Sequence, residues 1–81
     1  MDWSVYVIKS EVDGRLYKGM SQNVTLRLAT HNKGKVRSTK GYRPWNLVYT
    51  ERCSNREHAR GREKFLKSSA GRYFLKDLLS I

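Results

Sequence analysis

The stretch Ser4-Val5-Tyr6 … Leu16-Tyr17-Lys18-Gly19 decides the fold of this chain. Two runs rich in β-forming residues, 3–8 and 15–20, lie on either side of the dipeptide Asp13-Gly14. An Asp-Gly pair between such runs is typical of the turn of a β-hairpin. We therefore expect an antiparallel hairpin that carries Tyr6 on its first strand and Tyr17 on its second.

The parity of the pairing places the two tyrosines on one face of the hairpin. A two-residue turn makes the numbers of paired residues sum to 27, and a four-residue loop, Glu11 to Gly14, makes them sum to 25. Opposed side chains point the same way and alternate with period two, so either odd sum gives a shared face. The phenols are then roughly 13 Å apart along the strands with the shorter turn, and roughly 7 Å with the longer loop. A shared site therefore favours the longer loop. The alternative is that both are core tyrosines with a polar tip at the rim.

The composition indicates one small basic domain, residues 1–81. With 17 Lys and Arg against 7 Asp and Glu, the chain carries a formal net charge of +10. A charge of this size favours a polyanionic partner, nucleic acid first, although a basic domain without such a partner is the alternative. The lone Cys53 excludes an internal disulfide and predicts no disulfide-linked partner. No apolar run approaches the roughly 18 residues of a membrane span and no signal peptide is evident, so we expect a cytoplasmic protein that contacts no membrane.

Three helices are expected after the hairpin. Polar residues that cap helix N-termini mark the starts of the first two, and glycines mark their ends. The predicted helices are Ser21 to about Lys33, closed by Gly34; a second that begins at the capping box Ser54 to Glu57 and is closed by Gly71; and Arg72 to Leu79, whose Phe74, Leu75, Leu78 and Leu79 would cap the core.

The first predicted helix places two polar residues beside its apolar face. Val24 and Leu28 are four residues apart and share the face that packs on the sheet. Arg27 and His31 are also four apart and form an adjacent stripe. Taken alone, such a pair is ordinary on a helix surface.

Between the first helix and a third strand lies a basic segment, 33–43, which contains no acidic residue. Its glycines, hydroxyls and basic groups predict a flexible surface loop that takes no part in the core and suits contact with phosphate oxygens. A solvated charge run is the alternative. Pro44 then opens the expected third strand, Trp45 to Thr50, with Trp45, Leu47 and Tyr49 alternating against the residues between them.

Glu63 is the acidic residue with no local explanation. In the second helix it follows Ala59 and precedes Leu66 and Ala70 at spacings of four, three and four, so it interrupts an apolar stripe. An inward carboxylate must pair with a buried cation or hold a metal, because an unpaired buried charge is costly. An ion pair with Arg27 is the structural alternative to a metal site.

These residues, in this order, resemble the GIY-YIG endonuclease family, and in particular its small single-domain members, which are similar to the nuclease domain of the bacterial excision-repair endonuclease. Ser4-Val5-Tyr6 stands at the GIY motif and Tyr17-Lys18-Gly19 at the YIG motif. The segment 23–32 matches the helix of the motif arginine, and the match continues through residues 33–35, 44–49 and 59–67. Ser4 replaces the first glycine and Lys18 the middle isoleucine.

The resemblance implies an α/β (α+β) fold, a three-stranded antiparallel sheet flanked by about three helices, and a Mg²⁺-dependent endonuclease that cleaves DNA, with Mn²⁺ as a substitute and with DNA repair or recombination as the context. It also implies a site. Glu63 would hold the one metal ion, Arg27 would neutralise the scissile phosphate and Tyr6 would be the general base, made phenolate by nearby cations. Tyr17 would orient water or phosphate, and His31 would assist proton transfer or bind phosphate. The residues expected to contact nucleic acid are Lys18, Lys33, Lys35, Arg37, Lys40 and Arg43.

Two other classes of function fit the composition. A nucleic-acid-binding module without catalysis explains the charge and the basic segment but leaves Glu63 unexplained. A small protein of a ribonucleoprotein particle would also be basic. The residues do not decide between DNA and RNA.

Overall fold

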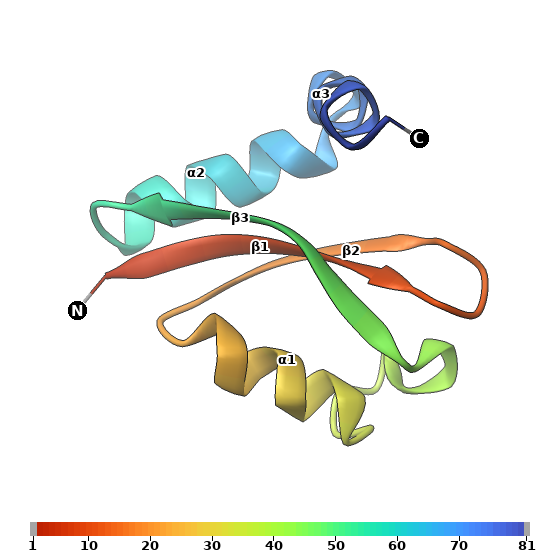
Figure 1. The fold of residues 1–81 in the computed structure, drawn as a ribbon. Helices are drawn as coiled ribbons and strands as arrows, with labels where there is room; N and C mark the ends of the chain where they lie inside the picture. The colour runs from red at the N-terminus through yellow and green to blue at the C-terminus, as the bar shows by residue number, and fades with distance from the viewer. Residues whose placement is uncertain (1, 81) are drawn as a thin grey trace.

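A three-stranded antiparallel sheet lies between one helix on one face and two helices on the other (Figure 1). The computed structural model describes residues 2–80. The elements are β1 (Trp3–Ser10), β2 (Leu16–Ser21), α1 (Val24–Asn32), a short 3-10 helix (Lys40–Tyr42), β3 (Trp45–Cys53), α2 (Arg56–Lys67) and α3 (Ser69–Leu79). The expected fold class, a three-stranded antiparallel sheet with three helices, is confirmed.

The hairpin adopts the longer of the two expected loops. Tyr6 pairs with Gly19 and Ile8 pairs with Tyr17, so the paired numbers sum to 25. The amide of Ser10 donates to the carbonyl of Arg15 at 2.9 Å, which closes the loop Glu11–Gly14. The rings of Tyr6 and Tyr17 lie on one face with centroids 6.4 Å apart.

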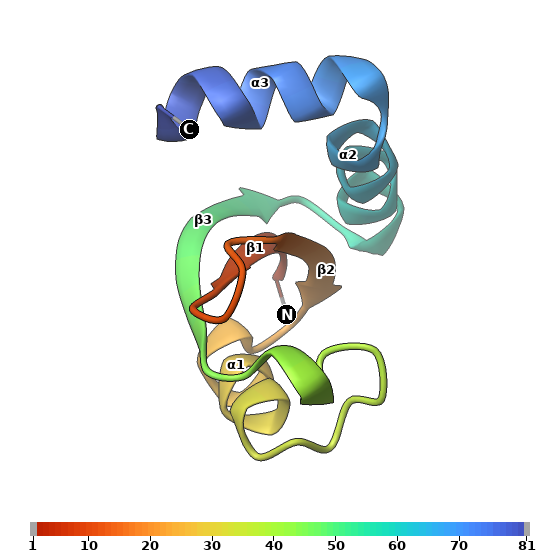
Figure 2. The ribbon, with the colours of Figure 1, turned by 90° about the vertical axis from the view of Figure 1, so that its right-hand side faces the viewer.

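The central strand β1 is buried on both faces. It lies between β2 and β3, and Val5, Tyr6, Val7 and Ile8 are each at most 1% exposed. Val5 and Val7 pack with α2 and α3, whereas Tyr6 and Ile8 pack on the side of α1. The two layers of helices on either side of the sheet are clearest when it is viewed from the side (Figure 2).

A β-bulge in β3 changes which face its odd-numbered residues occupy. Val7 pairs with Tyr49 but Ile8 pairs with Leu47, so Val48 is the extra residue. Trp45 therefore packs beside Tyr6 and Ile8, while Tyr49 packs with Val5 and Val7 on the other face. The expected simple alternation of Trp45, Leu47 and Tyr49 on one face is wrong for this reason.

The N-caps of the first two helices lie further along the chain than expected. Asn23 caps α1 by accepting from the Leu26 amide at 2.9 Å, while the Ser21 hydroxyl accepts from Asn23 itself. Asn55 caps α2 by accepting from the His58 amide at 2.8 Å. Asparagine is as good an N-cap as serine, and here it stands nearer the first residue of the helix.

The break between the last two helices lies at Ser68 and not at Gly71. The Ser68 side chain caps α3 by accepting from the amide of Gly71, which is inside the first turn. Gly71 is needed because a Cβ atom there would collide with the Phe65 carbonyl oxygen where α3 turns back over α2. Of the four apolar residues expected to cap the core, only Leu75 is fully buried; Leu79 is half-buried, and Phe74 and Leu78 are exposed.

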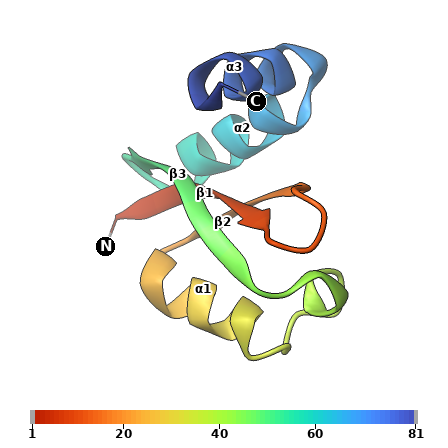
Figure 3. The same cartoon turned by 45° about the vertical axis from the view of Figure 1, so that its right-hand side comes forward.

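The basic segment 33–43 is more structured than expected. It contains turns and the short 3-10 helix, and Thr39 in its middle is 0% exposed. The indole of Trp45 donates to the Thr39 carbonyl at 2.9 Å, which fixes the segment against β3. Figure 3 shows the segment closing the end of the α1 layer. Among residues 2–80, no helix has the length and apolarity needed to cross a membrane.

We expect Gly71→Ala to lower the free energy of unfolding by about 1–3 kcal/mol, because the methyl group overpacks the contact between α2 and α3. The matched control is Gly61→Ala. Gly61 lies in α2 with open space around its Cβ position, so alanine there should raise stability by roughly 0.5–1 kcal/mol. Urea denaturation of both variants checks the pair, and equal effects would contradict the packing described.

Candidate active site

The phenol of Tyr6 reaches across the sheet to the edge strand β2. The side chain is 1% exposed and its hydroxyl lies 2.5 Å from where a Cβ atom of Gly19 would stand. Any other residue at position 19 would displace the phenol. The last glycine of the Tyr17-Lys18-Gly19 motif therefore makes room for the tyrosine of the first motif.

His31 is the direct partner of this phenol. Its Nε2 lies 2.9 Å from the Tyr6 oxygen and its Nδ1 lies 2.8 Å from the hydroxyl of Thr39. The imidazole is 0% exposed, so His31 is a core residue and not part of a surface stripe. Both ring nitrogens have protein partners, which leaves neither free to bind phosphate.

Tyr17 completes an aromatic cluster on this face of the sheet. Its ring lies 4.9 Å from the ring of His31 and 6.4 Å from that of Trp45, both in edge-to-face geometry. Tyr17 is half-buried, whereas Tyr6 and His31 are fully buried. The structure thus brings together the two phenols and the imidazole that the sequence singled out.

Nothing in the sequence pattern singles out Thr39. A threonine among lysines, glycines and serines has the composition of a loop. The one available signal is that Thr39 follows His31 by eight residues, with a turn between them. That signal is too weak to predict a hydrogen bond without coordinates.

Burial raises the pKa of Tyr6, more than the neighbouring Arg27 lowers it. The charge of Glu63 raises that pKa further. The expected phenolate is therefore not the resting state of the protein alone, and the phenol keeps its proton at neutral pH. To act as a base, Tyr6 must give its own proton away as it takes another.

His31 is suited to take that proton. Burial lowers its pKa below the usual 6.5, and the nearby Arg27 lowers it further. The imidazole is consequently neutral at pH 7, with one nitrogen free of hydrogen.

Glu63 approaches this cluster from α2, on the opposite face of the sheet. Its side chain is 18% exposed, and its Oε2 lies 3.5 Å from the Nζ of Lys67, one turn later. Within residues 2–80 its ion-pair partner is thus Lys67 and not Arg27, the structural alternative considered for it. The carboxylate is close enough to Tyr6 to act on the pKa of the phenol.

The donor set fits a weakly held magnesium ion. Residues 2–80 contain no group of three or more His, Cys, Asp or Glu side chains that could enclose a metal. Mg²⁺ needs less, since it keeps several waters and binds one or two carboxylates together with substrate phosphate oxygens. The half-buried carboxylate of Glu63 meets that requirement. A zinc site or a two-metal site needs more protein ligands than this carboxylate provides.

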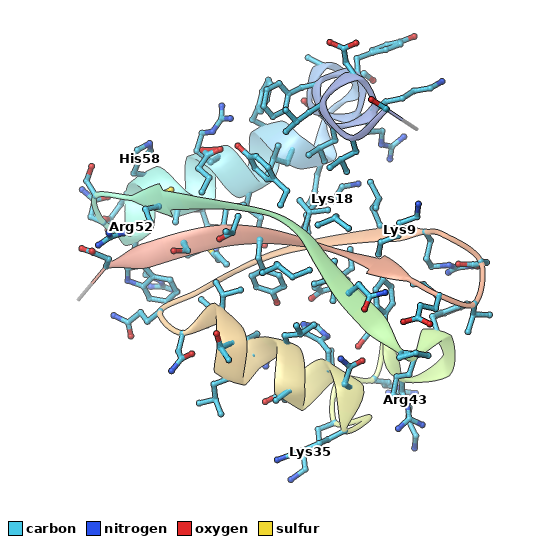
Figure 4. All side chains as sticks on the ribbon, in the orientation of Figure 1. Lys9, Lys18, Lys35, Arg43, Arg52 and His58 are labelled. Carbon is cyan, nitrogen blue, oxygen red and sulfur yellow. The ribbon has the colours of Figure 1, made fainter. Side chains whose placement is uncertain are left out.

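The basic residues expected to contact nucleic acid divide between two surfaces. Lys33, Lys35, Arg37 and Lys40 are exposed beyond the end of α1, and Arg43 folds back against Gly34 with its Nε donating to the Lys40 carbonyl at 2.8 Å. Lys18 lies on the other face of the sheet, toward α3 (Figure 4). Burial together with Arg72 and Lys67 lowers the pKa of Lys18, so these cations lie near one another, and Lys67 also contacts Glu63.

A three-stranded antiparallel sheet with helices on both faces carries the two tyrosine motifs on adjacent strands. The family model of the GIY-YIG catalytic domain matches residues 2–75, and the chain belongs to this family. It is 42% identical over 73 residues to a UPF0213 protein of Staphylococcus haemolyticus, a match that covers 89% of this chain and 88% of that one.

Two further relatives support this placement. A UPF0213 protein of Desulfotalea psychrophila is 39% identical over 67 residues, which cover 80% of this chain and 60% of that protein. The solution NMR structure of a UPF0213 protein of Bacillus halodurans is 31% identical and matches 96% of this chain and 85% of that one, with a TM-score of 0.58.

The environment of His31 leads to a prediction about acid. We expect the ring of His31 to titrate below pH 6.5, and its pKa to rise in Arg27→Gln because one of the two causes of the shift is removed. The unfolded chain binds this proton near pH 6.5, so the contribution to stability is complete above that pH and is lost as the pH falls through the folded pKa. NMR titration of the ring measures both proteins. A wild-type pKa at or above 6.5 would contradict the burial.

Proposed function

We propose that this protein is a metal-dependent endonuclease that hydrolyses phosphodiester bonds of DNA. The observation that carries the proposal is the 2.9 Å contact between the Tyr6 hydroxyl and Nε2 of a neutral, buried His31, with Arg27 and Glu63 acting on the same phenol. Its membership of the GIY-YIG family supports a nuclease. DNA as the substrate rests on that membership and on the net charge of +10.

Tyr6 and His31 supply the base for the attacking water. As the water oxygen bonds to phosphorus, its proton passes to the phenol oxygen while the phenol proton passes to Nε2 of His31. The P–O bond to the leaving oxygen breaks, and that oxygen takes a proton from solvent. The imidazolium formed in this way is buried and near Arg27, so once the products leave it returns its proton to the phenol oxygen, which releases the proton taken from water to solvent.

Arg27 stabilises the charge that develops on the phosphate. Its guanidinium already lies beside the phenol, which is where the reacting phosphate must approach if Tyr6 is the base. A planar fork of N–H donors matches the geometry of two phosphate oxygens. The half-buried Tyr17 lies beside Tyr6 and His31 and would orient the water or the phosphate.

Glu63 would hold Mg²⁺ or Mn²⁺, which, when bound, supplies positive charge to a non-bridging phosphate oxygen. The carboxylate is poised for this role because Lys67 contacts only one of its oxygens, at 3.5 Å. The exposed cations of segment 33–43 would hold the flanking phosphates without reading bases.

We expect Tyr6→Phe and Glu63→Gln each to lower the rate of DNA cleavage in Mg²⁺ by roughly 100-fold or more, because each removes a group that acts on the reacting atoms. The matched controls are Tyr73→Phe and Glu57→Gln, which remove an exposed phenol and an exposed carboxylate of α3 and α2. A time course on supercoiled plasmid measures all five proteins. Equal rates for a site variant and its control would exclude the mechanism.

We expect the triple change of Lys35, Arg37 and Lys40 to glutamine to weaken binding to all DNA sequences alike. Each lost phosphate contact lowers the slope of log affinity against log salt by about 0.9. The control with the same change in net charge replaces Arg52, Arg56 and Arg60 at the other end of the molecule, where Figure 4 shows Arg52. Fluorescence anisotropy in the Glu63→Gln background separates binding from cleavage. A sequence-selective loss, or an equal loss in both triples, would contradict the role of the segment.

Salt-sensitive binding with no cleavage in either metal would replace the nuclease by a binding module. Binding to RNA in preference to DNA would revise the substrate and leave the site unchanged.

A further inference from the structure

We infer that Thr39 is a positioning residue that fixes His31 in the tautomer with its proton on Nδ1, and so keeps Nε2 free to take the proton of Tyr6. Its value for catalysis rests on the proposed nuclease function. The tautomer itself does not, because it follows from the hydrogen bonds of the protein alone.

The hydroxyl of Thr39 is in contact with two groups. It lies 2.8 Å from Nδ1 of His31 and 3.3 Å from the carbonyl oxygen of Val36. A hydroxyl has one hydrogen, and the carbonyl can only accept. When the hydroxyl donates to Val36, its oxygen accepts from His31, and Nδ1 must carry the proton.

The other side of the imidazole leads to the same tautomer. The phenol of Tyr6 is 1% exposed, and its neighbours are Nε2 of His31 and the guanidinium of Arg27. A guanidinium only donates, so the phenol hydrogen has Nε2 as its acceptor. If Nε2 were protonated, both neighbours would donate to the phenol oxygen and the phenol hydrogen would be buried without a partner, which is costly.

Thr39 itself is held rigidly. Its carbonyl accepts from the indole of Trp45 at 2.9 Å and from the amide of Tyr42 at 3.1 Å, and its amide donates to the Val36 carbonyl at 3.1 Å. A hydroxyl fixed in this way can select one tautomer, whereas a mobile one could rotate to serve both. Thr39 also lies between the exposed Arg37 and Lys40. The segment proposed to contact phosphate therefore also carries the residue that fixes the tautomer of His31.

Two variants separate the hydroxyl from the shape of the side chain. Thr39→Val keeps the volume and removes the acceptor, and Thr39→Ser keeps the hydroxyl. Two-bond ¹H–¹⁵N correlation spectra of protein labelled at its two histidines report which ring nitrogen of His31 carries the proton. We expect the Nδ1–H form in wild type and Thr39→Ser, and a mixture or the Nε2–H form in Thr39→Val.

Cleavage should follow the tautomer. We expect Thr39→Val to lower kcat on the order of tenfold with little change in DNA affinity, and Thr39→Ser to remain close to wild type. A wild-type spectrum with the proton on Nε2, or an unchanged tautomer in Thr39→Val, would overturn the inference. The wild-type spectrum decides the matter even if the valine variant does not fold. Absence of wild-type cleavage in Mg²⁺ or Mn²⁺ would refute the proposed function and leave the spectroscopic test standing.

Discussion

The burial of β1 on both faces is the constraint on which the rest of the structure depends. A three-stranded sheet has one interior strand, and here four consecutive residues of that strand, Val5 to Ile8, are shielded from water. Covering both faces requires helices on both, which is why α1 lies on one side and α2 with α3 on the other. Removing apolar surface from water contributes about 25 cal/mol per Å², so a small domain gains most stability from a strand whose two faces are both buried. The phenol of Tyr6 is placed with the accuracy of a core residue.

That burial also shapes the chemistry. An exposed tyrosine close to several cations would lose its proton more easily, but the surroundings of Tyr6 favour the neutral phenol. The histidine beside it is likewise kept neutral. A pair of neutral, hydrogen-bonded groups holds no charge in the apolar interior at rest, where a charge would be costly, and the proposed imidazolium exists only during the reaction.

Much of the fold could be predicted from the sequence because its signals are local. The Asp13-Gly14 turn predicts the hairpin, and the parity of the strands predicts that the two tyrosines share a face. The register with paired numbers that sum to 25 is favoured only if the two phenols belong to one site, and the structure has this register. The partners of His31 could not be predicted, since they depend on a fold of the segment 33–43 that no periodicity marks. The prediction that Gly71 ends a helix is wrong, because the sequence does not distinguish a glycine that ends a helix from one that allows another backbone to approach closely. In the candidate site, residue types and order came from the family resemblance, while burial and hydrogen-bond partners came only with the coordinates.

The bulge at Val48 allows two odd-numbered residues of β3 to face opposite sides of the sheet. Before it, odd-numbered residues face α1; after it, they face α2 and α3. If the same residues formed a regular ladder without the bulge, either Trp45 or Tyr49 would turn to the wrong face. Trp45 is the residue whose indole holds Thr39 in place. The place of one extra residue in β3, far along the chain from both tyrosine motifs, thus decides whether the Trp45 indole can hold Thr39, and through Thr39 the imidazole of His31.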